Sequence, residues 1–93
     1  MEHKDLELKH ISIVNNKKYF ISTIKMQVRH SWLNQHDNTF VYETMIFKTE
    51  NEKVIYHEPV FNKRYNNYDK AINGHQDAID DIKFIIEKDT QNV

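Results

Sequence analysis

Apolar and polar residues alternate over much of the first two thirds of the chain, and this alternation predicts β-strands. The predicted strands cover residues 6–14, 19–30 and 40–48, and a fourth strand begins at Val54. Pro59 cannot donate a hydrogen bond to a neighbouring strand, so the fourth strand is expected to lie at an edge or to end there. The connections are short and polar, which favours antiparallel pairing of successive strands.

The first predicted strand has two apolar phases. Leu6 and Leu8 share one side of it, whereas Ile11 and Ile13 fall on the other side. A bulge near His10, or burial of both faces, would reconcile the two phases. The pair of asparagines that follows this strand tolerates positive φ, so it predicts a hairpin turn made without glycine.

The second and third strands differ in their patterns. The second alternates as a half-buried strand does, with Ile24, Met26, Val28 and His30 on one side and Thr23, Lys25, Gln27 and Arg29 on the other. The third strand is apolar on both faces apart from Glu43 and Thr44. A strand of that kind needs contacts on two sides.

Apolar residues recur at three- and four-residue spacing over residues 67–88, which predicts one amphipathic helix. Asn67 is a suitable N-cap, and Asp69 is favourable in the first turn. The apolar stripe consists of Ala71, Ile72, His75, Ala78, Ile79, Ile82, Ile85 and Ile86. Because β-branched residues are mediocre helix formers, this helix is expected to depend on packing against the sheet.

Together these elements predict a single α+β domain over residues 1–93. Its expected fold is an antiparallel four-stranded sheet, in the order β-β-β-β-α, with one C-terminal helix packed on one face. The other face is then uncovered, and Val41, Met45 and Phe47 are expected to line it. An uncovered apolar face usually marks a partner, so we hypothesise a homodimer through the open sheet face.

Composition narrows the classes of function. The 93 residues include one glycine, one proline and no cysteine, which excludes glycine-rich phosphate loops, cysteine metal sites and disulfide frameworks. The formal net charge of -1 argues against binding to nucleic acid. No apolar run approaches the length of a membrane span, so we expect a cytoplasmic protein without a membrane partner.

Two histidines and a carboxylate are the first candidates for chemistry. His30 ends the second strand, His75 lies in the helix stripe, and Glu43 lies on the adjacent strand. If the helix crosses the sheet, these three could hold a metal ion or act as general acid and base. The alternative is that the histidines are half-buried, hydrogen-bonded to backbone or to Glu43, and lock the helix onto the sheet. Because no short-range ligand spacing accompanies them, we assign no catalytic residue, metal ligand or cofactor.

Arg64 and Tyr65 come just before the predicted helix. An arginine beside the free backbone N–H groups that begin at Asn67 would suit an anion such as phosphate. The alternative is that Arg64 pairs with a surface carboxylate such as Glu43 or Glu58.

Aromatic and basic residues interleave at 17–20 and 61–65. On a sheet surface this arrangement can stack single-stranded bases. The alternative is that the aromatic rings pack in the core and at its rim, and the negative net charge favours that alternative.

The single glycine, Gly74, falls inside the predicted helix and immediately precedes His75. Glycine in a helix costs about 1 kcal/mol relative to alanine. We therefore expect Gly74 to permit a close approach of helix and sheet, or access to His75. Thr44 and Ala71 are also expected to be structural.

Several blocks along residues 21–80 form a recognisable pattern: Ser22-Thr23-Ile24, His30 with Trp32, Tyr42-Glu43-Thr44-Met45-Ile46-Phe47, Arg64-Tyr65, Asn67, Ala71 and Gly74-His75. These blocks resemble a family of small uncharacterised bacteriophage and prophage proteins, whose pattern includes F-E-T-M-V-F and R-Y-x-T-x-x-E-A-x-x-G-H. The N-terminal hairpin strand, residues 5–14, lies outside the resemblance. Arg29 stands where the family has an acidic residue, and Lys70 replaces the glutamate of its capping box.

The resemblance implies a phage setting and a compact fold, and it supplies no activity. We expect a non-enzymatic phage or prophage accessory protein that binds a host protein or a small anionic ligand, as a counter-defence inhibitor or a nucleotide-sequestering protein. The candidate ligand-binding residues are His30, Glu43, Arg64, Tyr65, Asn67 and His75. One alternative is a metal- or histidine-dependent enzyme, and another is a structural component of the virion or of a replication complex.

Overall fold

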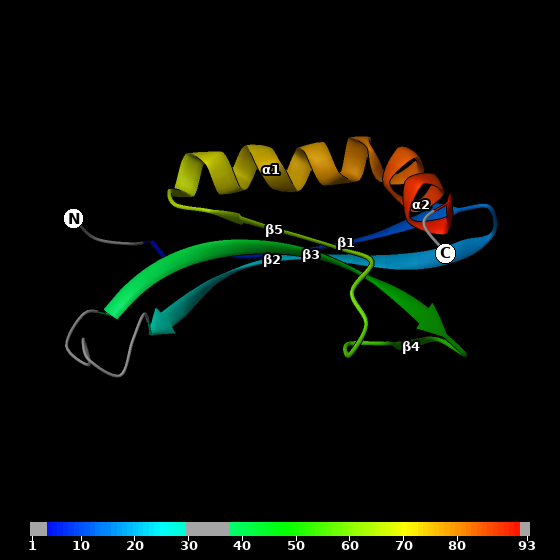
Figure 1. Ribbon diagram of the computed structural model, residues 1–93, viewed down its shortest axis with the longest axis horizontal. Coiled ribbons are helices and arrows are strands. Elements are labelled where there is room, and N and C mark those ends of the chain that lie inside the picture. The colour runs from blue at the N-terminus through cyan, green and yellow to red at the C-terminus, as the bar shows by residue number, and fades with distance from the viewer. Residues whose placement is uncertain (1–3, 30–37, 92–93) are drawn as a thin grey trace.

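The computed structural model of the chain describes residues 4–29 and 38–91. Both helices lie on one side of a curved antiparallel sheet (Figure 1). The elements in chain order are β1 (Glu7–Val14), β2 (Lys17–Arg29), β3 (Asn38–Glu50), β4 (Lys53–Val54), β5 (Phe61–Tyr65), α1 (Tyr68–Asp80) and α2 (Ile82–Gln91). The expected α+β class, with an antiparallel sheet and a helical layer on one face, is confirmed.

The long strand β3 organises the sheet. One edge of β3 pairs with β2, which in turn pairs with β1. The other edge is divided between β5, which pairs with the middle of β3, and β4, which pairs with its C-terminal end. All of these pairings are antiparallel, so β3 contacts three other strands and lies in the interior of the sheet.

The sheet has five strands rather than the expected four. The fourth expected strand is only the two residues Lys53–Val54, and residues 61–65 form a further strand. In β5, Phe61 and Tyr65 are half-buried, whereas the three polar residues between them, which include Arg64, are exposed. An alternation this short and this charged does not stand out in the sequence. The strand exists because β3 offers it a free edge.

The expected single helix over residues 67–88 is two helices that meet at Asp81. Asp81 has φ -100° and ψ 7°, and its N–H donates to the Asp77 carbonyl at 2.8 Å while its own carbonyl accepts from Ile85 N at 3.0 Å. Aspartate is a weak helix former, and the bend directs α2 toward the hairpin end of the sheet, where Ile86 joins the core. Neither helix in the described part of the chain has the length and apolar character that a membrane span requires.

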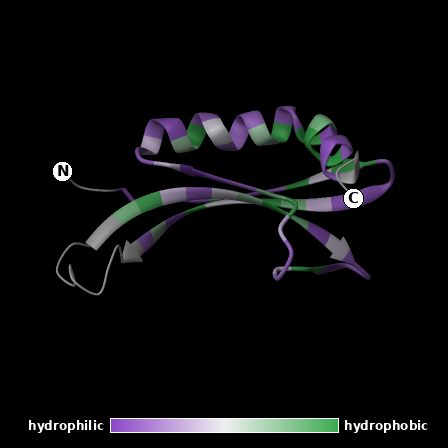
Figure 2. Ribbon diagram, viewed as in Figure 1, coloured by the Kyte–Doolittle hydropathy of each residue, from purple (hydrophilic) through white to green (hydrophobic). Residues whose placement is uncertain are grey.

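The core lies between the helices and one face of the sheet. Its larger cluster consists of Val14, Tyr19, Ile21, Ile46, Ala78, Ile82 and Ile86, and its smaller cluster of Leu6, Tyr42 and Ala71. Hydrophobic and hydrophilic bands succeed one another along the long strands (Figure 2). The buried side of β2 carries Ile21 and Thr23, whereas Ile24 and Met26 lie on the side that faces away from the helices.

The two apolar phases of β1 have a different origin from the one expected. β1 pairs with β2 in an unbroken register from Glu7 to Val14, so no bulge is present. Leu6 is buried on the helix side, but Ile11 is 62% exposed and Ile13 is 67% exposed on the other side. Both expected explanations, the bulge and the burial of both faces, are therefore wrong. One phase belongs to the core and the other to an uncovered surface.

The hairpin turns are made without glycine, as predicted. Asn15 has φ 51° and Asn16 has φ 68° between β1 and β2. The turn between β3 and β4 repeats this geometry, with φ 52° at Asn51 and 67° at Glu52. Left-handed conformations at both central positions match the twist of an antiparallel hairpin.

A close contact between α1 and β5 accounts for the helix glycine. A Cβ atom on Gly74 would come within 2.6 Å of Cε2 in the Tyr65 ring, which is closer than real carbon atoms approach. The backbone of Gly74 does not have positive φ, so space rather than conformational freedom requires glycine here. The close helix–sheet approach expected at Gly74 is present, and the ring of Tyr65 makes it.

We predict that Gly74→Ala lowers the free energy of unfolding by about 1–2 kcal/mol. The added methyl group must displace the Tyr65 ring, and that overpacking outweighs the gain of about 1 kcal/mol in helix propensity. Urea denaturation measures the change. The control is Asn73→Ala on the exposed side of the same helix, which should not destabilise the protein. In a Tyr65→Leu background the same alanine should become stabilising, and a Gly74→Ala protein more stable than the wild type would contradict this account.

Candidate functional site

Three buried polar side chains join α1 to the centre of the sheet. Nδ1 of His75 lies 2.7 Å from Oγ1 of Thr23, which lies 2.6 Å from Oγ1 of Thr44. The two threonines are direct cross-strand partners on β2 and β3, and both are fully buried. Because a buried polar group without a partner costs about 1–3 kcal/mol, each member of this set depends on the others.

The surroundings of His75 disfavour the protonated form of its ring. Burial lowers the pKa of His75 below its ordinary value of 6.5, and the charge of the neighbouring His10 lowers it further. The side chain is only 7% exposed. This geometry agrees with the expectation of a histidine that locks the helix onto the sheet, although its partner is Thr23 rather than backbone or Glu43.

The grouping of His30, Glu43 and His75 is not formed as expected. His30 lies outside the described residues. Glu43 follows Tyr42 and precedes Thr44 on β3, and Thr44 faces the helices. Since successive residues of a strand face opposite sides, Glu43 and His75 lie on opposite faces of the sheet. Among the described residues, no group of three or more histidine, aspartate and glutamate side chains is placed to hold a metal ion.

Glu43 is bound to an arginine on the neighbouring strand. Nε of Arg64 lies 3.4 Å from Oε2 of Glu43, and the two residues are cross-strand partners on β5 and β3. The Glu43 side chain is 5% exposed and that of Arg64 is 56% exposed, so the guanidinium covers the carboxylate. Of the two expectations for Arg64, the pairing with Glu43 is the one that the structure contains.

Arg64 does not join the start of α1. Tyr65 points to the helix side of β5 and packs against Gly74, whereas Arg64 points to the other side. Asn67 is the N-cap of α1, and its side-chain oxygen accepts a hydrogen bond from Lys70 N at 2.8 Å. The anion site expected at this helix start is therefore not formed by Arg64.

The aromatic rings in the two mixed aromatic and basic segments are packed rather than presented. Tyr19 is buried in the core, and the rings of Phe20 and Phe47 stack with centroids 6.3 Å apart. Phe61 packs against the larger core cluster. These contacts agree with the expectation that the rings pack in the core and at its rim.

The face of the sheet opposite the helices is apolar and uncovered by any helix of the described chain. We define the open face by Ile11, Ile13, Phe20, Ser22, Ile24, Met26, Val41, Met45 and Phe47, which the strand registers place on one side. Ile24 is 41% exposed. Tyr56 packs on Phe47 with centroids 5.1 Å apart and covers only that end.

The strand registers place Val41, Met45 and Phe47 on the face opposite the helices, as expected, but Phe47 is buried there and Tyr56 packs on its ring. Sequence reasoning missed the contribution of β1, because it attributed Ile11 and Ile13 to a bulge or to a second buried face. Their placement could have been predicted by assigning the side of β1 that carries Leu6 to the core and the side that carries Ile11 and Ile13 to the exposed surface.

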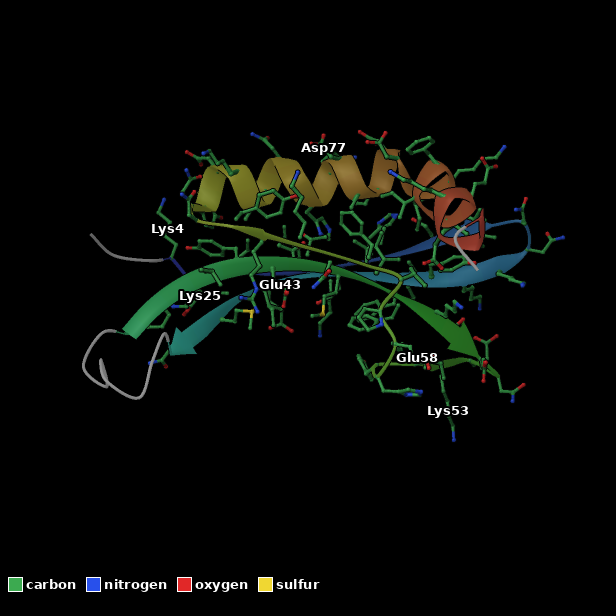
Figure 3. The ribbon with its side chains drawn as sticks, in the orientation of Figure 1. Lys4, Lys25, Glu43, Lys53, Glu58 and Asp77 are labelled. Carbon is green, nitrogen blue, oxygen red and sulfur yellow. The ribbon has the colours of Figure 1, made fainter. Side chains whose placement is uncertain are left out.

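The charges within the open face are paired with one another. Lys9 and Glu7 lie 2.8 Å apart on β1, and Arg64 covers Glu43 on the opposite edge of the face. The interior of the face between these two pairs consists of apolar side chains and Ser22. Glu43 lies at the sheet, whereas Asp77 lies on the outer surface of α1, away from the open face (Figure 3).

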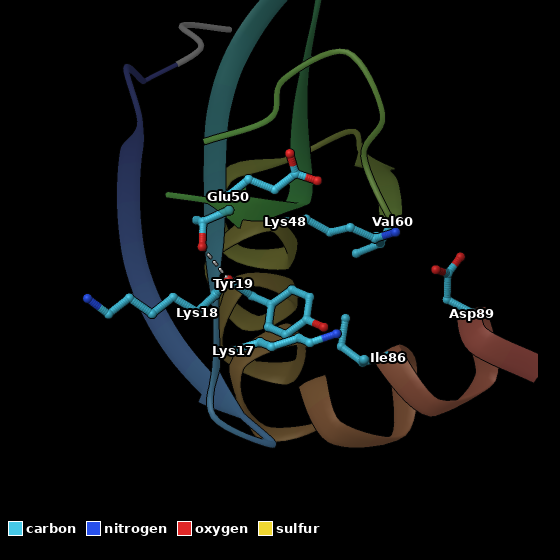
Figure 4. A pocket seen from close by; sticks show the side chains of 9 residues that line it. Lys17, Lys18, Tyr19, Lys48, Glu50, Val60, Ile86 and Asp89 are labelled. Carbon is cyan, nitrogen blue, oxygen red and sulfur yellow. Dashed lines mark hydrogen bonds between the residues drawn. The ribbon is translucent and has the colours of Figure 1, made fainter. Parts of the chain in front are cut away.

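A groove of about 460 Å³ lies between the hairpin end of the sheet and α2 (Figure 4). Its lining residues are Lys17, Lys18, Tyr19, Lys48, Thr49, Glu50, Val60, Ile86 and Asp89. Lys18 is held by Glu52 at 2.9 Å, and the two remaining ammonium groups share the groove with the carboxylates of Glu50 and Asp89. Burial and the charge of Asp89 raise the pKa of Tyr19, so its hydroxyl stays protonated.

Comparison of the chain with protein-family models, with curated proteins and with solved structures finds no significant match.

We predict that protonation of His75 destabilises the fold as the pH falls. The folded pKa lies below the unfolded value of 6.5, so the unfolded chain takes up the proton first. Stability from this group is therefore complete above pH 6.5 and is lost as the pH drops below it, with a slope of at most about 1.4 kcal/mol per pH unit. Urea denaturation across this range measures the slope.

The control substitution is His57→Gln, because His57 is an exposed residue and its removal should leave the slope unchanged. His75→Gln should flatten it. An unaltered slope in the His75→Gln protein would show that other groups cause the acid sensitivity.

Proposed function

We propose that this protein is a non-enzymatic binding module that acts by presenting the open face to another protein. The observation that carries the proposal is the exposure of Ile11, Ile13 and Ile24 on one regular surface, at 62%, 67% and 41%. Single exposed apolar side chains are ordinary, but a contiguous apolar surface on a small protein is typical of an interaction site.

The charge distribution favours a protein partner over a nucleic acid or a small anion. The charged residues on the described part of the open face are each paired within the chain, so this part offers no free cation to a phosphate. In the groove, two ammonium groups are balanced by the carboxylates of Glu50 and Asp89 once Lys18 is paired with Glu52. Binding of phosphates depends on an excess of cations, which neither surface has.

His75 and Glu43, the two described side chains of the three considered for catalysis, are engaged in structural contacts, and this supports a role without chemistry. His75 is closed from solvent and bonded to Thr23, and Glu43 is covered by Arg64. A general acid or base must reach the proton that it transfers. On the resemblance of residues 21–80 alone, we propose a phage or prophage accessory role in counter-defence.

A photo-crosslinking amino acid tests this proposal at two matched positions. We expect p-benzoylphenylalanine in place of Ile24 to give a light-dependent adduct with a protein in bacterial cells, because Ile24 lies within the open face. The same amino acid in place of Asp77, on the outer surface of α1, should give no adduct. Gel mobility and mass spectrometry identify what is attached.

Adding Ile11→Lys and Ile13→Lys to the Ile24 reporter should abolish the adduct while circular dichroism remains native, because both side chains are exposed and contribute little to the core. Equal adducts from both reporter positions, or an adduct that nuclease removes, would overturn the proposal.

A further inference from the structure

We infer that the protein surface that fits the open face is a second copy of this chain, packed face to face about a two-fold axis. This inference rests on the proposed function, since it names the partner of the same surface. It concerns a homodimer in which two five-stranded sheets form the centre and the helices form the two outer layers.

The first support is the neutrality of the face. A hetero-partner is commonly selected by complementary charge, whereas a self-partner presents the same charges and must avoid repulsion. The charged residues that the described strands place on this face are paired within the chain, Glu7 with Lys9, Glu43 with Arg64 and Lys18 with Glu52. Two copies can therefore meet across the apolar centre without bringing unpaired like charges together.

The second support is the complementarity of the two edges. Glu7 lies on β1, at one edge of the face, and Arg64 lies on β5, at the opposite edge, in the same cross-strand row. An axis parallel to the strands places β1 of one copy above β5 of the other. Glu7, with a side chain 66% exposed, then faces the partner's Arg64 across the rim, and the partner's Glu7 faces Arg64 in return.

The third support is the size of the surface. Four strands spaced by about 4.8 Å, each contributing about eight residues of about 3.3 Å, give a flat area of about 500 Å² before side-chain relief is added. Standard protein–protein interfaces bury about 800 Å² per partner. Two copies would therefore bury about 1,000 Å² in total before side-chain relief is added, which is at the lower end of the range for specific interfaces.

Pairing through the edge of the sheet is the competing arrangement. Within the described chain β1 pairs only with β2, so its outer backbone groups are also available. Edge pairing would leave Ile24 and Met45 facing solvent, whereas face-to-face packing covers them together with Ile11. The burial of apolar surface therefore favours the faces.

Sedimentation of the purified full-length chain tests the inference directly. We expect a dimer at micromolar concentration, and we expect Ile24→Lys to raise the dimer dissociation constant at least about 10-fold, because it places an unpaired charge in the centre of the interface. Ile11→Lys should act in the same direction. The matched control is Phe84→Lys on α2, a residue 66% exposed and remote from the open face, which should leave dimerisation unchanged.

Single cysteines distinguish the two arrangements, because the chain contains no cysteine. Face-packed sheets lie about 10 Å apart, so Ser22→Cys should be joined to its copy by a bismaleimide with a spacer of that length. Ser12→Cys on the helix side of β1 reports edge pairing, and Asp77→Cys on the outer surface of α1 reports random collision. Neither should be joined.

A monomer at high micromolar concentration overturns the inference, and so does a dimer that is insensitive to Ile24→Lys or is joined through Ser12→Cys. The proposed function fails separately. A monomer whose Ile24 position crosslinks to a different protein in cells refutes the homodimer and leaves the binding function standing. A monomer without any protein adduct refutes both.

Discussion

The hydrogen bond between His75 and Thr23 is the contact on which the rest of the structure depends. It fixes α1 above the centre of β2 and β3, because Thr23 is itself held by Thr44. The ring of Tyr65 sets the separation of helix and sheet at Gly74, one residue away along the helix. Once these contacts are made, the helices cover one face of the sheet and the opposite face is left open.

This choice of face places polar residues inside and apolar residues outside. Thr23 and Thr44 are completely buried, while Ile11 and Ile13 are more than half exposed. Exposed isoleucines forgo the transfer free energy that burial would contribute, about 1.5–3 kcal/mol for each side chain. A partner that covers the open face would recover this transfer free energy. The exposed surface therefore supports a binding function, whereas His75 is engaged in a structural contact.

Local signals in the sequence were reliable where one interaction dominates. The asparagine pair at Asn15 and Asn16 makes the turn, Asn67 caps α1, and the antiparallel α+β class follows from the alternation and the short connections. The bend at Asp81 and the strand at residues 61–65 were not predictable. Helical spacing continues through the bend, and β5 forms only because the edge of β3 is available.

The candidate site also combines features that the sequence predicts with features that only the tertiary structure shows. The sequence by itself determined which residues share a side of each strand, and that Val41, Met45 and Phe47 would be left on an uncovered face. It could not determine which side of β1 and β2 meets the helices, because either phase has apolar residues. The tertiary structure decided this: the side that carries Thr23 meets the helices, and Thr23 supplies the hydrogen-bond partner that the buried His75 needs. Because the Thr23 side of β2 meets the helices, Glu43 lies on the opposite face of the sheet from His75. For the same reason Ile11 and Ile13 of β1 are exposed.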